Sequence, residues 1–164
     1  MKRTARPAGV TARRGGVKKR RRRSRPWRIV PHTADIGLAV RGRTLSRLFE
    51  NAGSALCELV AGAPAQVRPR RRVRIAVRGS AIDDLLVRWL QELLFLQETR
   101  GWRFRDCTVE RLDRRGLMLR GSATGEPFDP VVHPRGREIK AVTYHDLRLV
   151  RRAGMWTVRI ILDV

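Results

Sequence analysis

The chain has 164 residues, a length that suits one compact domain with a tail. Hydrophobic residues make up 42%, enough for a core, but 37 Lys and Arg oppose only 15 Asp and Glu, a formal net charge of +22. This charge favours polyanionic partners such as RNA, DNA or acidic protein. No apolar run approaches the roughly 18 residues that a membrane-spanning helix needs, and no apolar segment follows the basic N-terminus, as a secretory signal requires.

These exclusions indicate a cytoplasmic protein without a membrane partner. The two cysteines agree with that localisation, because Cys57 and Cys107 form no CxxC pair and each lies among apolar residues. We interpret them as small buried hydrophobic side chains in a reducing compartment.

The charge is concentrated at the N-terminus. Residues 1–26 contain twelve Lys and Arg and no acid, and removing them leaves a net charge of about +10. This segment has little to bury, so we interpret it as a disordered basic tail before a domain at 27–164. The tail offers RNA phosphates a run of cations, or is a solvated extension with no specific role. The run comprises Lys18, Lys19, Arg20, Arg21, Arg22 and Arg23.

The first elements of the domain are two strands and a helix. Residues 27–30 and 36–42 have the composition of strands, and the turn-like residues 31–35 separate them. Thr44 is a suitable N-cap for the helix that follows. Apolar residues then recur at helical spacing from Leu45 to Val60, and Gly62 ends the pattern.

A strand and a second helix follow a loop at 63–69. Residues 71–78 alternate apolar and basic side chains, which predicts a half-buried strand. Ser80 is the predicted cap of a helix that runs to about Gln97, with Asp83 and Asp84 in its first turn. This helix is apolar on most faces and should be largely buried.

The C-terminal half is predicted to be mainly strands, at 102–112, 117–124, 138–144, 146–152 and 155–164, with an irregular segment at 125–130. The order of elements predicts the α+β class. We expect a single two-layer domain in which two helices pack on a mostly antiparallel sheet.

Catalytic motifs are missing from the sequence. There is no GxxxxGK[ST], GxGxxG or HExxH pattern, which argues against an ordinary enzyme.

Two acidic positions are more informative: Asp35 lies between two strand-forming runs, and Asp163 interrupts an apolar strand one residue before the final carboxylate of Val164. Carboxylates that lie close together need a cation, and Ca²⁺ and Mg²⁺ prefer such oxygen ligands. Alternatively, Asp35 stabilises a turn and Asp163 faces solvent.

A basic residue stands out in the segment 138–144. Lys140 shares a predicted strand face with Glu138 and Val142. It forms a cross-strand ion pair, or it presents a cation to phosphate or to a carboxylate of a partner. The residues alone do not decide between these roles.

Four segments, taken in order, resemble the archease family over about residues 27–164. They are Pro31 to Gly37 with the helix start at Thr44-Leu45; Leu90 to Phe95; Gly125 to Asp129 with His133-Pro134 and Gly136 to His145; and Ile160 to Val164. Each is short, but their order and spacing are specific. The family often has Asp where this chain has Pro31, which weakens the case for a further metal ligand there, and the basic tail is not part of the family pattern.

The resemblance implies a non-enzymatic activator of an RtcB-type RNA ligase, which uses GTP and divalent metal to join RNA ends in tRNA splicing and RNA repair. Archeases promote guanylylation of the ligase histidine and multiple turnover. The resemblance implies a metal site, with Ca²⁺ expected and Mg²⁺ or Mn²⁺ as alternatives, formed by Asp35, Asp163 and Val164. It also matches Lys140 to the functionally important lysine of the family and places His32 in its N-terminal motif.

Two other functions remain open at this point. A basic RNA-binding or RNA-chaperone module would bind RNA with steep salt dependence through the tail, although aromatic residues, at 5%, are too few to favour base stacking. A metal-dependent hydrolase would need a substrate pocket and a base that the sequence does not reveal.

Overall fold

The computed structural model describes residues 25–31, 35–115 and 117–164. His32 and the run Lys18 to Arg23 lie outside these residues, as do most positions of the predicted tail. The elements in chain order are β1 (Trp27–Pro31), β2 (Ile36–Gly42), α1 (Leu45–Ala61), a 3-10 turn (Pro64–Gln66), β3 (Arg71–Arg78), α2 (Ile82–Glu98), β4 (Trp102–Asp113), β5 (Met118–Pro127), β6 (Ala141–Val142), β7 (Arg148–Arg152) and β8 (Met155–Asp163).

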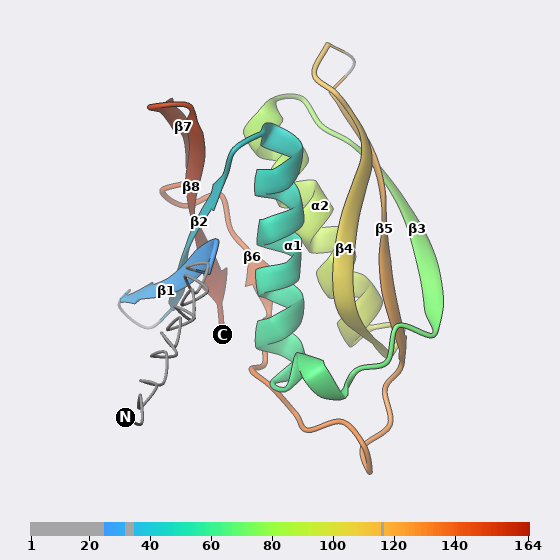
Figure 1. Cartoon of the computed structure of the whole chain (residues 1–164). Helices are drawn as coiled ribbons and strands as arrows, with labels where there is room; N and C mark the ends of the chain where they lie inside the picture. Colours follow the sequence, from blue (N-terminus) through green and yellow to red (C-terminus); the bar gives the residue numbers. More distant parts are fainter. Residues whose placement is uncertain (1–24, 32–34, 116) are drawn as a thin grey trace, which may run out of the picture.

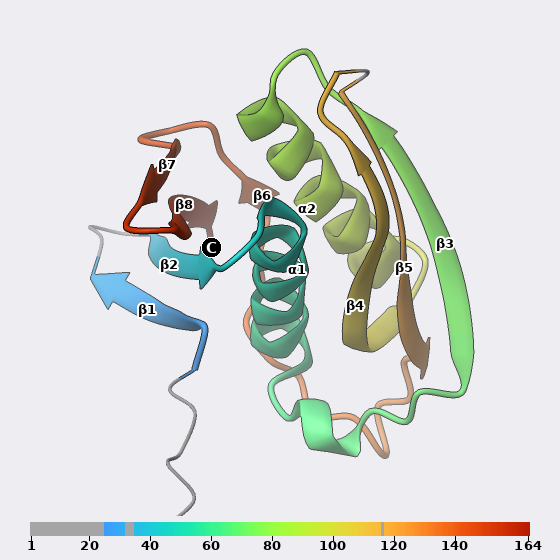
Figure 2. The same ribbon diagram turned by 45° about the horizontal axis from the view of Figure 1, so that its top comes forward.

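The strands form two antiparallel sheets, and the helices lie between them (Figures 1 and 2). Sheet A has the order β1-β2-β8-β6, with β7 also paired to β8; sheet B has the order β3-β5-β4. Helix α1 contacts both β2 of sheet A and β4 of sheet B. The α+β prediction is therefore confirmed, but the strands are divided between two sheets where one sheet was expected.

The division into two sheets follows from the helices themselves. Eight residues of α2 are buried, including Leu86, Trp89 and Leu93, and eleven residues of α1 are buried. A helix with so wide an apolar surface cannot bury all of it against one sheet, so a second sheet is needed on the other side of the helices. Trp89 is fully buried between the layers, and its indole N–H donates to the Phe49 carbonyl oxygen at 3.2 Å.

The helix starts show one correct and one wrong prediction. Thr44 caps α1 as predicted, because its side chain accepts a hydrogen bond from the Arg47 N–H at 3.1 Å. Ser80 does not cap α2. Instead, the Asp84 carboxylate accepts from the Ser80 backbone N–H at 2.7 Å and from its hydroxyl at 2.9 Å.

Two strand predictions need correction. Residues Gly125 to Pro127, expected to be irregular, extend β5, where Gly125 pairs with Arg71. The predicted strand 138–144 is reduced to Ala141–Val142, because the preceding residues lie against α1: the Arg137 N–H donates to the Leu59 carbonyl at 2.8 Å. Lys140 and Thr143 on either side of this short strand still donate backbone hydrogen bonds to Asp163 and Ile161 of β8, so the pairing with β8 is kept only near Ala141 and Val142.

The prediction that both cysteines are small buried side chains is confirmed. Cys57 of α1 and Cys107 of β4 are free and buried, with Sγ atoms 3.6 Å apart. The hydrogen bond to Cys57 and burial raise the pKa of the Cys107 thiol. Among the residues that the structure describes, no helix is long and apolar enough to cross a membrane.

Candidate functional site

The β2–β8 pairing brings two predicted metal ligands to the same end of sheet A. The last paired residues there are Ile36 and Leu162, and Asp35 and Asp163 each lie one residue beyond that pair. Positions directly opposite in an antiparallel pair have Cβ atoms roughly 5 Å apart. Both aspartates are partly buried, and directly opposite positions share a face of the sheet, so the register brings the two acidic residues together there.

Lys140 joins them from the other side of β8. Its backbone N–H donates to the Asp163 carbonyl oxygen at 2.8 Å, and Ala141 pairs with Asp163 in the β6–β8 ladder. Its exposed side chain extends to the end of the chain, where Nζ donates to the Val164 oxygen at 2.9 Å. The structure thus brings together four predicted site residues: Asp35, Asp163, Val164 and Lys140.

The chemistry of this cluster suits a hard cation. The carboxylates of Asp35 and Asp163 and an oxygen of Val164 are the type of donor that Ca²⁺ and Mg²⁺ prefer. In the described part of the chain, no group of three His, Cys, Asp or Glu side chains could hold a metal ion. A cation here would therefore depend on Val164 as its third protein ligand. The Lys140 ammonium already supplies one positive charge at that oxygen.

The surface beside Lys140 is hollowed. A cavity of about 500 Å³ lies between α2 and residues 138–142, and Phe95 and Glu98 of α2 face it together with Lys140. Phe95 is 44% exposed, and exposed aromatic side chains are typical of protein interfaces. The cluster therefore lies next to a surface that a protein partner could cover.

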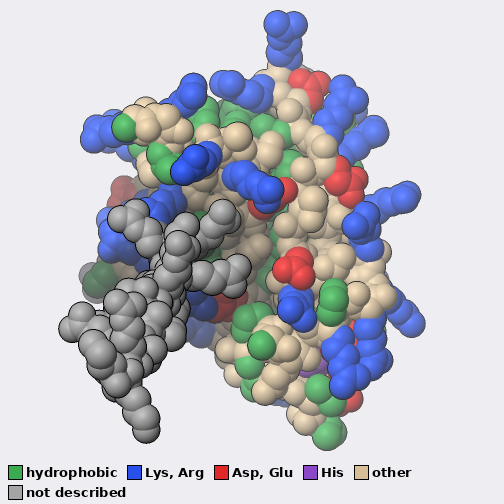
Figure 3. All heavy atoms as spheres, viewed as in Figure 1, with side chains coloured by type: hydrophobic (Ala, Val, Ile, Leu, Met, Phe, Trp, Pro, Cys, Tyr) green, Lys and Arg blue, Asp and Glu red, His purple; other side chains and the backbone are tan. Residues whose placement is uncertain are grey.

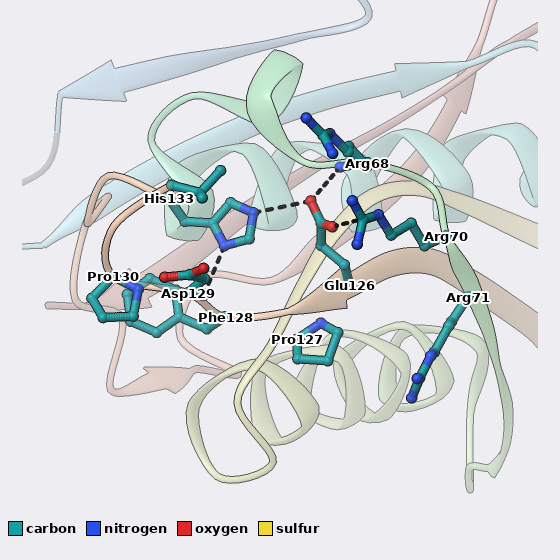
Figure 4. A pocket seen from close by; sticks show the side chains of 10 residues that line it. Arg68, Arg70, Arg71, Glu126, Pro127, Phe128, Asp129, Pro130 and His133 are labelled. Atoms are coloured by element: carbon teal, nitrogen blue, oxygen red, sulfur yellow. Dashed lines mark hydrogen bonds and ion pairs between the residues drawn. The ribbon is translucent and has the colours of Figure 1, made fainter.

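A second polar cluster lies outside the predicted site. Glu126, at the end of β5, is 7% exposed and accepts hydrogen bonds from the Arg68 backbone N–H at 2.8 Å and from His133 (Figure 4). His133 Nδ1 accepts the Asp129 N–H at 2.9 Å, so its proton resides on Nε2, 3.1 Å from Glu126. The Arg70 guanidinium is 3.3 Å from the same carboxylate.

These contacts hold Glu126 as a carboxylate. The Arg68 N–H, with His133 and Arg70 beside it, lowers the pKa of Glu126 below its ordinary value. Sequence reasoning missed this cluster because Glu126 belongs to the segment 125–130, predicted to be irregular, and His133 follows it where no element was predicted. The available signal was two ionisable residues, seven positions apart, on either side of the apolar Pro127 and Phe128.

Comparisons with known proteins identify the same family in each case. Residues 27–164 match the archease protein family. The chain is 38% identical to the archease of Methanopyrus kandleri over 140 residues, which cover 85% of this chain and 99% of that protein. It is 36% identical to the archease of Pyrococcus furiosus, again over 85% and 99% of the two chains.

Solved structures agree as well. The solution structure of protein 1598 of Methanobacterium thermoautotrophicum matches with a TM-score of 0.72 and 30% identity, over 85% of this chain and 99% of that one. An archease of Thermotoga maritima, described as a possible chaperone, shares the fold at a TM-score of 0.55 and 22% identity, over 82% and 94% of the two chains. With its sequence matched from Trp27 to Val164 and its fold shared with these relatives, the chain belongs to the archease family.

Proposed function

We propose that this archease is a non-enzymatic activator of a GTP-dependent RtcB-type RNA ligase. It promotes guanylylation of the ligase histidine and multiple turnover in tRNA splicing and RNA repair. The proposal rests on family membership and on one structural observation: the Lys140 ammonium is bonded to Val164, at the sheet end that also carries Asp35 and Asp163.

The proposed mode of action is differential binding. An accessory protein changes the rate of its partner only if it binds one conformation of that partner more tightly than another. Lys140 is exposed and lies beside Phe95 and a cavity of about 500 Å³. A cation and an aromatic side chain at one surface offer the anionic nucleotide site of a ligase an electrostatic and an apolar contact.

A divalent cation belongs to the proposal. When bound by Asp35, Asp163 and Val164, it would neutralise the carboxylates and add positive charge beside Lys140. We expect Ca²⁺, with Mg²⁺ or Mn²⁺ as alternatives, because all three donors are oxygen atoms.

The test is a guanylylation assay with a fixed amount of ligase, GTP labelled on the α-phosphate, and substoichiometric archease. Wild-type archease should accelerate labelling of the ligase, and Lys140→Ala should reduce the acceleration about tenfold or more, since a hydrogen bond to a charged group is worth about 1.5–3 kcal/mol. Lys140→Arg should retain part of it, because the charge remains.

Two control variants separate this site from general loss of charge. Asp106→Asn removes an exposed carboxylate on β4 of sheet B and matches Asp163→Asn. Arg148→Ala removes an exposed cation on β7 and matches Lys140→Ala. Both controls should activate like wild type, whereas Asp163→Asn should not. Equal activation by Lys140→Ala and wild type, with both folded, would contradict the site assignment; absence of any wild-type acceleration would contradict the function.

A further inference from the structure

Strand β3 carries a row of exposed arginines on the face of sheet B that points away from the helices. Val73, Ile75 and Val77 pack toward the core, so the alternate residues point outward. Three of these are Arg72, Arg74 and Arg78, all exposed, and we call them the β3 arginine row. Lys and Arg side chains are prominent on the side of the molecule where β3 lies (Figures 1 and 3).

The charges of the β3 arginine row are not neutralised by the neighbouring strand. The residues opposite Arg72, Arg74 and Arg78 on β5 are the uncharged Thr124, Ser122 and Met118. None of the three arginines forms an ion pair with another described residue. Arg120 of β5, opposite Ala76, extends the same basic surface.

The acidic residues of this sheet lie elsewhere. Asp106, Glu110 and Asp113 belong to β4, two strand spacings or roughly 10 Å from β3. Asp106 and Asp113 are therefore about one Debye length away at physiological salt and screen the row weakly. Asp106 is also paired with Arg105. The Glu110 carboxylate reaches β5, where it contacts Ser122 opposite Arg74, so it offsets part of the charge at the middle of the row.

The row continues into a cavity at the start of β3. This cavity, of about 580 Å³, is lined by Arg68, Arg70 and Arg71 together with His133 and two carboxylates, Glu126 and Asp129, so its arginines outnumber its acids by one (Figure 4). Arg70 is bonded to Glu126, whereas the Arg71 side chain points away from it. Positive charge therefore extends from the cavity along the length of β3.

We propose that the β3 arginine row binds the phosphodiester backbone of a nucleic acid without reading its sequence. Guanidinium groups bind phosphate oxygens in pairs of hydrogen bonds, which suits Arg more than Lys. The outward residues of β3 and β5 are Arg, Ala, Thr, Ser and Met, so they offer no aromatic ring on which bases could stack.

The chemistry of this face favours a phosphate backbone over a protein. Protein interfaces depend on buried aromatic or aliphatic anchors, and opposite the β3 arginine row β5 offers one apolar side chain, the partly buried Met118, and no aromatic ring. The inference does not rest on the ligase proposal. Binding is measured without the ligase, so either proposal can fail alone.

A different role for the row is protection of an exposed sheet edge, since β3 is an outer strand of sheet B. Charged side chains prevent edge strands from pairing with other chains, and charge of either sign suffices. Phosphate binding needs positive charge. Charge reversal therefore separates the two roles.

The experiment compares two charge-reversed variants of the full chain. The first is Arg72→Glu/Arg74→Glu/Arg78→Glu. The matched control is Arg148→Glu/Arg151→Glu/Arg152→Glu on β7, an edge strand of sheet A that also has three exposed arginines. Both change the net charge equally, and residues 1–24 are the same in both. Fluorescence anisotropy gives the affinity for labelled oligouridylate, oligoadenylate, oligothymidylate and polyglutamate between about 50 and 200 mM salt.

The β3 variant should bind oligouridylate and oligoadenylate about tenfold or more weakly than the control, with a salt slope smaller by about 2, the value for three lost contacts to a single strand. The oligothymidylate arm tells whether RNA is preferred over DNA. Equal losses in both triple variants, unchanged RNA affinity, or polyglutamate binding as tight as RNA binding would overturn the proposal. If the Glu variant does not fold, Arg72→Gln/Arg74→Gln/Arg78→Gln replaces it, with the matching Gln control.

Discussion

Tyr144 connects the segment that follows Lys140 to the start of α2. Its hydroxyl donates to the Asp84 carboxylate at 2.6 Å, and the same carboxylate accepts hydrogen bonds from Ser80 and from Arg88 Nε at 3.0 Å. These donors, Tyr144 first, hold the pKa of Asp84 well below its ordinary value of 3.8. The bond to Asp84 raises the pKa of Tyr144 in turn. One carboxylate therefore fixes both a helix end and a loop.

Tyr144→Phe tests this connection. The substitution should raise the pKa of Asp84 toward its ordinary value and reduce the free energy of unfolding by about 0.5–1 kcal/mol near neutral pH, a modest loss because Tyr144 is exposed. Because a depressed carboxyl pKa stabilises the fold above the unfolded-state value, this contribution decreases as the pH falls below 3.8.

Two measurements check the Tyr144 prediction. NMR titration of the Asp84 carboxyl gives its pKa in both proteins, and urea unfolding at about pH 7 and about pH 3 gives the stability difference at each pH. The difference between wild type and Tyr144→Phe should be smaller at the lower pH. A difference that stays constant with pH would show that the ring, and not the bond to Asp84, carries the effect.

At the scale of elements, the loop between β5 and β6 is held against the C-terminal end of α1. A Cβ atom on Gly136 would lie 2.3 Å from the Leu59 carbonyl oxygen and 2.4 Å from that of Val60. Arg137 N–H donates to the same Leu59 oxygen at 2.8 Å. Backbone atoms surround Gly136, so a side chain there forces the loop away from the helix. That loop leads directly to Lys140.

Gly136→Ala should therefore destabilise the fold by about 1–3 kcal/mol, the usual cost of overpacking. Gly154→Ala is the control: Gly154 has φ of +73° but open space around it, so its substitution measures backbone strain of about 1–2 kcal/mol without crowding. Chemical denaturation of both variants gives the comparison. If Gly136→Ala lowers the free energy of unfolding no more than Gly154→Ala, the loop adapts to the added side chain. The close contact with α1 then does not restrict residue 136 to glycine.

The same elements show how far the sequence predicts this fold. Periodicity located both helices and the strands around 27–42 and 71–78, since these patterns depend on which residues are buried. It did not show what buries them, so the second sheet was missed. The strand at 138–144 was overpredicted because the chain before it is held against α1 through the Arg137 N–H, so only Ala141 and Val142 pair regularly with β8.

The candidate site shows a related limit. Both strands that carry Asp35 and Asp163 were predicted, but their register was not, because a slip of two residues leaves the alternation of apolar side chains unchanged. The residues alone left a shared cation site for the two aspartates as one of two alternatives, and the resemblance to archeases favoured it before the structure placed them together. The contact of Glu126 with His133 depends on the course of a loop, which no periodic pattern encodes.

At the scale of the whole molecule, β2 and β8 are the inner strands of sheet A, and they carry the two carboxylates at one end. A cation bound there would connect the N-terminal and C-terminal parts of the domain. Without a cation, the two like charges oppose the same pairing. The proposed metal site therefore predicts that calcium stabilises the fold. It also predicts that removing one carboxylate lowers the stability when calcium is present but does not lower it when calcium is absent.

Asp163→Asn is the decisive variant. For wild type, Ca²⁺ at a hundredfold excess over its Kd should raise the free energy of unfolding by about 2.7 kcal/mol, which shifts Tm by several degrees. In Asp163→Asn this gain should vanish, whereas in chelator the variant should be at least as stable as wild type, because one of two repelling charges is gone. Asp106→Asn, on the other sheet, should keep the full calcium gain. Thermal unfolding of wild type and both variants in calcium and in chelator measures these differences. If Asp163→Asn retains the calcium gain, Asp163 is not a ligand.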